Sequence, residues 1–350
     1  MKVKLVDVCT CESSNLKQSD VINISGKYPV YGATGKIGYI DTYKQEKTYI
    51  AIVKDGAGIG RTHLCDSKSS VIGTLQYILP KDNVLPEYLF YVIKHMHLEK
   101  YYSGATIPHI YFKNYKNEEF NLDSINKQET IIYILNDCNK LINLKETQLQ
   151  KYDDLIKARF VEMFGDIHDN DSEFDVVTIE DVCSLIKDGT HQTPQYIENK
   201  EEGYKFLSSK DVMSQKIDWT NMKYIPAELH KKLYASIKPR RNDILMSKNG
   251  VNYGVAAVND TDEVFDIYVS LALLRPKPII NPIFFRCVIN NPGTKRQFDS
   301  NIKGIGVPNL HLREIKKTRI ILPPMELQNE FVSFVQQVDK SKFIQMNSTI

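Results

Sequence analysis

The chain has 350 residues, 42% hydrophobic and 25% charged, which is typical of a globular protein with two domains of roughly 120 to 150 residues each. No apolar run reaches the ~20 residues of a membrane span, and the start lacks the apolar stretch of a secretory signal, so we expect a cytoplasmic protein. The net charge of +2 does not by itself indicate a nucleic-acid partner, and six scattered cysteines without a C-x-x-C pair argue against a zinc ribbon or a disulfide framework.

The predicted elements of the first half mix strands and helices. An apolar strand at Tyr49–Val53 enters a glycine-rich turn, Lys54–Gly60, and a helix-like stretch opens at Leu85-Pro86. A short proline element follows at Thr106–Ile110, and a helix begins at Gln128. This mixture predicts an α+β fold.

The same elements recur in the same order roughly 175 to 200 residues later. A strand at Ile244–Met246 enters a second turn led by a lysine, Lys248–Gly254, and a second helix opens at Asn281-Pro282. The second proline element is Gly306–Leu310, and Gln328 begins the second matching helix. Several matches in one order favour an internal duplication over coincidence.

The segment from Gln128 to Phe164 contains no proline or glycine, and its apolar residues alternate steps of four and three. Such a heptad pattern predicts a helix of roughly 55 Å that packs against another helix. The alternative is a long core helix of one large domain, but its position between two repeats favours a rod that sets their separation. The predicted packing residues are Ile131, Leu135, Ile142, Leu149, Tyr152 and Ile156.

A second helix is predicted after Pro323-Pro324. By the repeat offset, the counterpart of Tyr152–Phe164 would lie beyond Ile350, so we expect this copy to be shorter than the first by about three turns. The apolar spacing is also lost from Gln345 onward. If this second helix packs antiparallel against the first, it would hold the two repeats at a fixed separation. Its predicted packing residues are Leu327, Phe331, Phe334 and Val338.

Five phrases, taken in chain order and with the duplication, resemble the specificity subunits of Type I restriction-modification systems. They are Tyr28–Gly35, the two glycine turns that begin with lysine, Lys187–His191, and Leu322–Gln328. The resemblance covers essentially the whole chain. It implies two similar mixed α/β target-recognition domains, residues 1–125 and 166–323, separated by a long coiled-coil-type helix at 126–165 and followed by a truncated antiparallel helix at 324–350.

The resemblance also implies a protein without catalytic chemistry or a cofactor. Such subunits bind a split double-stranded DNA sequence, dock two modification subunits that methylate adenine, and meet the restriction or motor subunits through the complex. The short second helix leaves other interpretations open: a truncated or silent allele, a protein-binding decoy of the modification subunits, or a bundle that another chain completes. A solitary nuclease or methyltransferase is the alternative from the enzyme class.

The motifs that would indicate nucleotide binding, methyl transfer or metal binding are incomplete in this sequence. Gly32–Lys36 is no phosphate loop, because position 30 lacks the glycine and position 37 lacks the Ser or Thr that the motif requires. Asn291–Gly293 departs from the Asn-Pro-Pro-aromatic motif of an adenine methyltransferase. His95 and His97 are two residues apart and would face different sides of a helix, so we expect no metal site.

Glycine turns let backbone approach phosphate, and cationic, amide, imidazole and hydroxyl side chains beside them suit contacts with phosphates and base edges. A locally basic stretch at residues 295–319 adds further candidates. The predicted DNA-binding residues are Thr34, Lys36, Lys54, Arg61 and His63 in the first half, and Lys187, Thr190, His191, Gln192, Lys248, Asn249, Asn252, Lys303, Asn309, His311 and Arg313 in the second.

Overall fold

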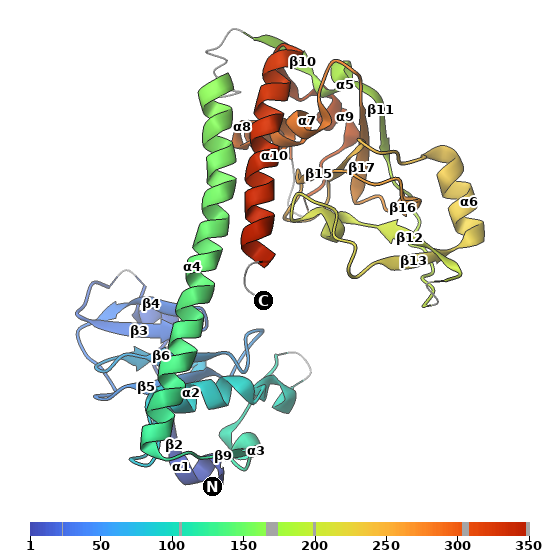
Figure 1. Cartoon of the computed structure of the whole chain (residues 1–350). Helices are drawn as coiled ribbons and strands as arrows, with labels where there is room; N and C mark the ends of the chain where they lie inside the picture. The colour runs from blue at the N-terminus through green and yellow to red at the C-terminus, as the bar shows by residue number, and fades with distance from the viewer. Residues whose placement is uncertain (23, 105–106, 166–173, 199–200, 303–307, 348–350) are drawn as a thin grey trace. The chain divides into compact units, whose positions relative to one another are not determined.

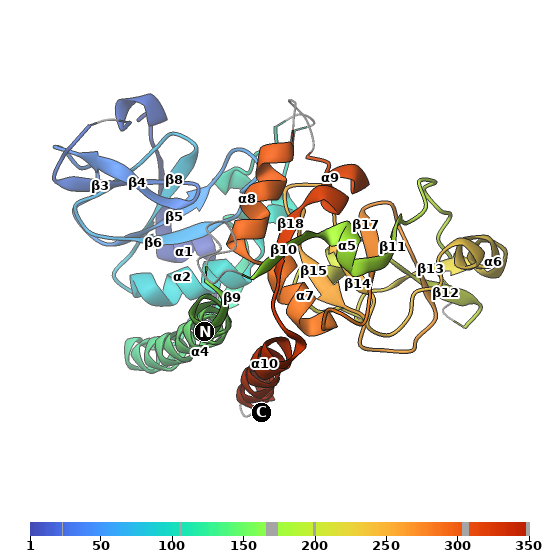
Figure 2. The same cartoon turned by 90° about the horizontal axis from the view of Figure 1, so that it is seen from above.

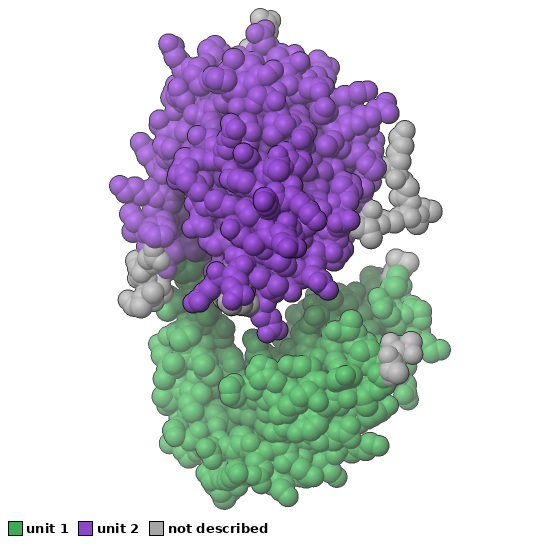
Figure 3. Space-filling view, turned by 90° about the vertical axis from the view of Figure 1, so that its right-hand side faces the viewer, with its two compact units in different colours: residues 1–145 green, residues 146–350 purple. Residues whose placement is uncertain are grey.

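The computed structural model describes residues 1–22, 24–104, 107–165, 174–198, 201–302 and 308–347. The chain divides into two compact units, residues 1–145 and 146–350, coloured green and purple in Figure 3. Each unit has its own hydrophobic cores and is described by itself. The boundary between the units falls within helix α4 (Ile125–Phe164), so this helix contributes to both.

The first unit is built on an antiparallel four-stranded sheet in the order β2-β8-β5-β6. A second sheet, β4-β3-β7, joins β3 to β4 antiparallel and to β7 parallel. A third pairs β1 with β9. The strands are β1 (Lys2–Lys4), β2 (Cys9–Ser13), β3 (Tyr28–Gly32), β4 (Gly35–Ile40), β5 (Tyr49–Val53), β6 (Thr62–Cys65), β7 (Ser70–Val71), β8 (Leu75–Pro80) and β9 (Glu119–Asn121).

Strand β5 is buried along its whole length because both of its faces are covered. Ile50 and Ile52 pack into one core with helix α2 (Pro86–His95), whereas Tyr49 and Val53 face the core beneath β3 and β7. The remaining helical elements of this unit are α1 (Leu5–Val8), η1 (Gln18–Asp20), η2 (Leu98–Tyr101) and α3 (Phe112–Tyr115).

The second unit repeats this arrangement. Its four-stranded sheet has the order β11-β17-β14-β15, and its three-stranded sheet, β13-β12-β16, again combines one antiparallel with one parallel pairing. The strands are β10 (Asp175–Thr178), β11 (Cys183–Asp188), β12 (Gly203–Leu207), β13 (Lys223–Pro226), β14 (Ile244–Ser247), β15 (Ala256–Val258), β16 (Phe265–Ile267), β17 (Leu271–Pro276) and β18 (Arg319–Leu322), with β10 paired to β18.

Helices cover the second unit more heavily than the first. Helix α7 (Pro282–Ile289) contacts both α10 (Met325–Asn347) and β15, and Figure 2 shows it between them. Helix α6 stands where the first unit has only the loop after β4. The helical elements are α5 (Ile179–Val182), η3 (Ser209–Val212), α6 (Ala227–Ser236), α7 (Pro282–Ile289), α8 (Pro292–Asn301), α9 (Leu312–Lys317) and α10 (Met325–Asn347).

The predicted duplication is visible in a pair of buried glutamines. The Gln128 Oε1 accepts a hydrogen bond from the backbone N–H of Leu85 at 2.8 Å, and the Gln328 Oε1 accepts one from Asn281 at 2.8 Å. Each Nε2 donates to two backbone carbonyls in addition. Both glutamines are 0% exposed, so each clamps the start of a preceding helix to the first turn of α4 or α10.

The predicted long helix is confirmed as α4, and α10 begins directly after Pro323-Pro324 as expected. Within the second unit, the last turns of α4 pack antiparallel against α10 (Figure 1), because Arg159 pairs with Glu330 at 2.9 Å and Asp153 with Lys342 at 2.7 Å. Rings of Phe160, Phe164, Phe284 and Phe331 form the aromatic centre of this contact.

The heptad residues do not form one continuous seam. Ile131 packs on the core of the first unit, whereas Ile156 packs on that of the second. Ile142 is 55% exposed, so its expected packing is wrong for this chain. Within the second unit, Gln345 near the end of α10 donates a hydrogen bond to Gln148 of α4. Phe331 and Val338 are buried, and the half-buried members are Leu135, Leu149, Tyr152, Leu327 and Phe334.

Candidate nucleic-acid interface

The glycine turn and the proline element are joined by the same two backbone hydrogen bonds in each unit. In the first, Gly56 N–H donates to the Pro108 carbonyl at 2.9 Å and Ile110 N–H donates to the Lys54 carbonyl at 2.9 Å. In the second, the corresponding distances are 3.0 Å from Gly250 to Pro308 and 2.7 Å from Leu310 to Lys248. Two motifs that are far apart in sequence therefore form one surface in both copies.

The turns need glycine because their backbones enter the left-handed region. Gly56 has φ of +93° and Gly250 has φ of +88°, with open space where a Cβ would stand. The absence of a side chain leaves room for a ligand to approach the backbone beside the polar residues. We name residues 33–36, 54–63 and 108–113 the first turn surface, and residues 187–192, 248–254 and 308–313 the second turn surface. Thr106, Gly306 and Val307 of the predicted proline elements lie outside the described residues.

A charged cluster organises the first turn surface. Asp55 contacts the Lys54 ammonium at 2.6 Å and the His109 Nδ1 at 2.6 Å. Burial alone would raise the pKa of Asp55, but the hydrogen bonds from Lys54 and His109 outweigh burial and lower it. The His109 ring stacks on Tyr111, which is 46% exposed. An imidazole and a phenol ring are thus held at the surface next to the turn.

The tip of the β3–β4 hairpin completes this surface. The Arg61 guanidinium donates to the Ala33 carbonyl at 2.9 Å, and the His63 Nε2 lies 3.2 Å from the same oxygen. Thr34 beside them is exposed, and Lys36 pairs with Asp66 at 2.8 Å with half of its side chain exposed. Thr34, Arg61 and His63 are therefore brought together at the hairpin tip, while Lys36 and Lys54 are each paired with an aspartate.

In the second turn surface, Lys248 is 4% exposed and its ammonium contacts Asp188 at 3.0 Å. The expectation that Lys248 contacts DNA is therefore wrong, because a buried, paired ammonium cannot reach a phosphate without breaking its ion pair. Lys248 holds the turn on β11 instead. Asn249 next to it has a buried Oδ1 without a hydrogen-bond partner in the part of the chain that the structure describes.

The predicted DNA-binding residues at the end of β11 and directly after it lie in different surroundings. Lys187 is exposed and its ammonium donates to the Ser236 carbonyl of α6 at 3.3 Å, away from the turn. Thr190 is held by backbone hydrogen bonds to Ile267 and Val269, and its Oγ1 accepts from Gln192 N–H. His191 is largely exposed, 3.6 Å from Asp188. Thr190 and His191 thus border the Lys248 pair.

The remaining candidates follow the second proline element. Asn309 is bridged to Asn249, and His311 precedes the first turn of α9, with both side chains exposed. Asn252 and Arg313 are also exposed. Lys303 lies outside the described residues. The second turn surface therefore presents amide, imidazole and guanidinium groups.

Sequence reasoning missed Asp55, His109, Tyr111 and Asp188. Asp55 and Asp188 carry the ion pairs of the two lysines, and His109 stands where the second copy has Asn309. Comparison of the two repeats could have identified His109, because its counterpart Asn309 is among the predicted DNA-binding residues. The β-bridge pairs 55–109 and 249–309 occupy equivalent places in the two turn surfaces.

The six cysteines are free, and burial raises the pKa of the Cys9 and Cys183 thiols to about 12. In the described ranges, no group of three or more His, Cys, Asp or Glu side chains could hold a metal ion. No helix within those ranges is sufficiently long and apolar to span a membrane.

Comparison with known proteins identifies similar chains. A family model described as Type I restriction modification DNA specificity domain matches residues 1–151 and 171–350. The Type I restriction enzyme MjaIX specificity subunit of Methanocaldococcus jannaschii is 24% identical over 283 residues, 74% of this chain and 63% of that protein. The EcoBI specificity subunit of Escherichia coli is 24% identical over 141 residues, 39% of this chain and 29% of that protein. The chain thus spans less than two thirds of either relative.

The fold resembles that in the crystal structure of a Type-I restriction-modification system S subunit from M. genitalium. The TM-score is 0.57, with 15% sequence identity over 99% of this chain and 91% of that one. At this level of identity the likeness concerns the fold, two mixed α/β domains joined by a long helix.

Proposed function

Because the chain belongs to the family of Type I restriction-modification DNA specificity domains, we propose that it reads a DNA target in two parts, one at each turn surface. Residues 1–125 and 166–323 would be the two target-recognition domains. The chain would select the sequence, and partner subunits would supply the chemistry on DNA. This proposal places the protein in the cytoplasm, where its DNA substrate is.

The observation that carries the proposal is the duplicated joining of glycine turn and proline element. Each copy sets a glycine with open space at its Cβ position beside side chains of the kinds that bind phosphates and base edges. Arg61 and Arg313 are the exposed guanidinium groups, and guanidinium suits phosphate or guanine. One scaffold used twice fits a split target.

The two turn surfaces differ in the groups that they offer to bases. The first has His109 held by Asp55 beside Tyr111, whereas the second has Asn309 beside Asn249. Asparagine amides can pair with the adenine edge in the major groove, and an imidazole offers one donor and one acceptor. The two halves would therefore prefer different base sequences.

The helices offer a surface for the modification subunits. In the first unit, α4 exposes Tyr133, Ile134 and Leu141, and in the second, α10 exposes Phe343 and Ile344, all by half or more. Exposed apolar side chains of this number on helices mark protein interaction sites. Two methyltransferase subunits would dock here, and restriction subunits would join through that complex.

The test is methylome sequencing of a host that expresses this chain with its modification subunits, compared with a host that lacks only this chain. We expect methyladenine at one split motif in the first host alone. No new motif, with the chain expressed and bound to its partners, would contradict the proposal and favour a protein-binding decoy or a silent allele.

A further inference from the structure

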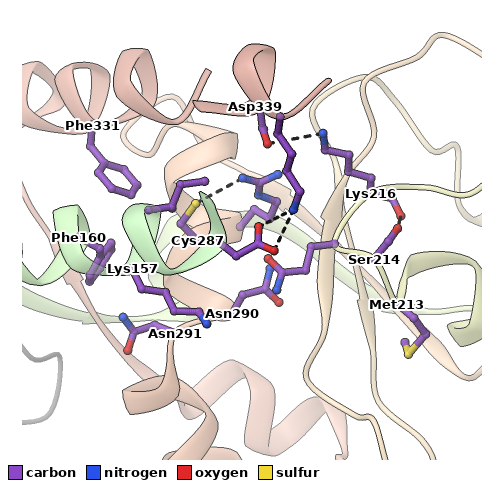
Figure 4. Close-up of a pocket in the computed structure, with 15 residues that line it drawn as sticks. Lys157, Phe160, Met213, Ser214, Lys216, Cys287, Asn290, Asn291, Phe331 and Asp339 are labelled. Atoms are coloured by element: carbon purple, nitrogen blue, oxygen red, sulfur yellow. Dashed lines mark hydrogen bonds and ion pairs between the residues drawn. The ribbon is translucent and has the colours of Figure 1, made fainter. Parts of the chain in front are cut away.

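A cavity of about 250 Å³ lies within the second unit, away from its turn surface. Its walls come from α4, α7 and α10 and from the segment that follows η3, including Met213 and Lys216 (Figure 4). The cavity therefore lies where the helix pair meets the recognition half of this unit. Nothing in the proposed DNA contact uses it.

The charged side chains of the cavity do not balance. Four cations line it, Lys157, Lys216, Arg286 and Lys342, against the two carboxylates of Asp153 and Asp339. Lys342 contacts Asp153 at 2.7 Å, and Lys216 is 3.6 Å from Asp339. Each lining carboxylate is thus already paired with a lysine.

Arg286 is the cation that these ion pairs leave over, because Lys157 pairs with Asp154, outside the lining, at 3.1 Å. Asp339 and Asp153 still act on Arg286 at longer range. Its Nε is buried and has no hydrogen-bond partner among the described residues, and its Nη2 contacts only the Cys287 sulfur, at 3.6 Å. Sulfur is a weak acceptor, whereas guanidinium stays charged at any physiological pH. A buried guanidinium nitrogen without a hydrogen-bond partner is costly, so this group favours an added acceptor.

The size of the cavity limits what the acceptor can be. Pockets for drug-sized ligands measure about 300–1,000 Å³, so this one suits a small anion. Guanidinium binds the oxygens of phosphate in a bidentate manner, and the lysines add charge around it. A tetrahedral oxyanion matches both the surplus charge and the space.

We propose that this cavity binds a small tetrahedral oxyanion, inorganic phosphate or sulfate, through Arg286 with Lys157 and Lys342 around it. The bound anion ties α7 to the facing turns of α4 and α10 and to the segment after η3. The site is independent of the proposed DNA contact, and its test uses no DNA.

The test compares thermal unfolding of the full chain in phosphate and in chloride at equal ionic strength and pH. Phosphate stabilises most proteins through exclusion from their surface, so the comparison must be made between variants. At a phosphate concentration ten times the Kd, the ratio of folded to unfolded protein rises about eleven-fold for a specific site. We expect this specific rise in the wild-type chain and its loss in Arg286→Gln.

Arg241→Gln is the matched control, because it removes one positive charge outside the cavity from an arginine paired with Asp262. It should keep the wild-type response. Broadening of the phosphorus NMR signal of inorganic phosphate should follow the same order. Should Arg286→Gln fail to fold, Lys157→Gln replaces an exposed cavity cation and should weaken phosphate binding several-fold.

An equal phosphate response in the wild type and Arg286→Gln would overturn the proposal, as would a wild type that responds no more to phosphate than to chloride. Stabilisation by adenosine monophosphate without stabilisation by inorganic phosphate would also overturn it, because the ligand would then be a nucleotide.

Discussion

The two halves of the chain have the same four-stranded sheet but pair the lysine of the glycine turn with different carboxylates. In the first half, Lys54 contacts the next residue, Asp55. In the second, Asn249 follows Lys248, and Asp188 on β11 provides the carboxylate. The first half has Ser13 at the place of Asp188, because Ser13 faces Gln76 on β8 as Asp188 faces Ala272 on β17.

This difference shows which features the scaffold requires. The glutamine clamps and the backbone hydrogen bonds of the turns are the same in both halves, so they define the fold of each copy. The ammonium needs a nearby carboxylate, but the carboxylate can come from the turn itself, as Asp55 does, or from strand β11, as Asp188 does. Side chains at the turn surface are therefore free to vary while the backbone stays in place.

The largest effect should come from Phe331→Ala, which tests whether the halves are separately stable. Phe331 is fully buried against Phe160, Phe164 and Phe284, so its loss should destabilise the second half by about 3–5 kcal/mol. Hydrogen exchange should show the loss in the second unit only. Phe343→Ala, at a 65% exposed position of α10, is the control and should change little. An equal loss of protection in the first unit would show that the two halves are not separately stable.

The exchange of carboxylates can be tested directly. Asp188→Ser leaves the buried Lys248 unpaired and should cost about 3–5 kcal/mol of stability, measured by denaturant unfolding. Adding Asn249→Asp recreates the arrangement of the first half and should restore most of the loss. A double variant as unstable as Asp188→Ser alone would show that the two arrangements are not interchangeable.

The glutamine clamps should be of equal importance in the two halves. Gln128→Ala or Gln328→Ala leaves a buried N–H and two carbonyls without partners, so each should cost about 2–3 kcal/mol. Gln337→Ala on the exposed face of α10 is the control. Unequal losses, in unfolding followed for each unit by hydrogen exchange, would show that one clamp is dispensable.

The salt dependence of DNA binding should depend on the two arginines of the turn surfaces. Removing one phosphate contact by Arg61→Ala or Arg313→Ala should reduce the slope of log affinity against log salt by about 0.9. Arg241→Ala, before the start of β14 and so at the opposite end from the turn, should leave the slope unchanged. An unchanged slope in both turn-surface variants would count against the proposed contacts.

The smallest effect concerns pH. The lowered pKa of Asp55 means that its ion pairs stabilise the folded first half fully above about pH 5, and that this contribution is lost as the pH falls through 3.8 and below. Asp55→Asn should therefore lessen the acid sensitivity of hydrogen exchange in the first unit, by under about 1 kcal/mol. Asp41→Asn in the exposed loop after β4 should not, and equal shifts in both variants would argue against this account.

The sequence predicted the repeated elements because their signals are local. Two glutamines at the same place in two helices, and two glycine turns after apolar strands, can be read without knowing the fold. The burial of Lys248 could not be predicted in this way, because it depends on an ion pair with Asp188, a residue 60 positions earlier. The exposure of Ile142 likewise could not be predicted, because a heptad pattern does not specify which of its positions a partner helix covers.

The most direct test of the two-part account is methylome sequencing with a variant altered in one turn surface alone. Arg61→Ala combined with His109→Ala changes the first surface and leaves the second intact. Expressed with the modification subunits, this variant should methylate a motif relaxed at one part, with the other part and the spacing unchanged. Relaxation of both parts together, or a single undivided motif, would contradict the account.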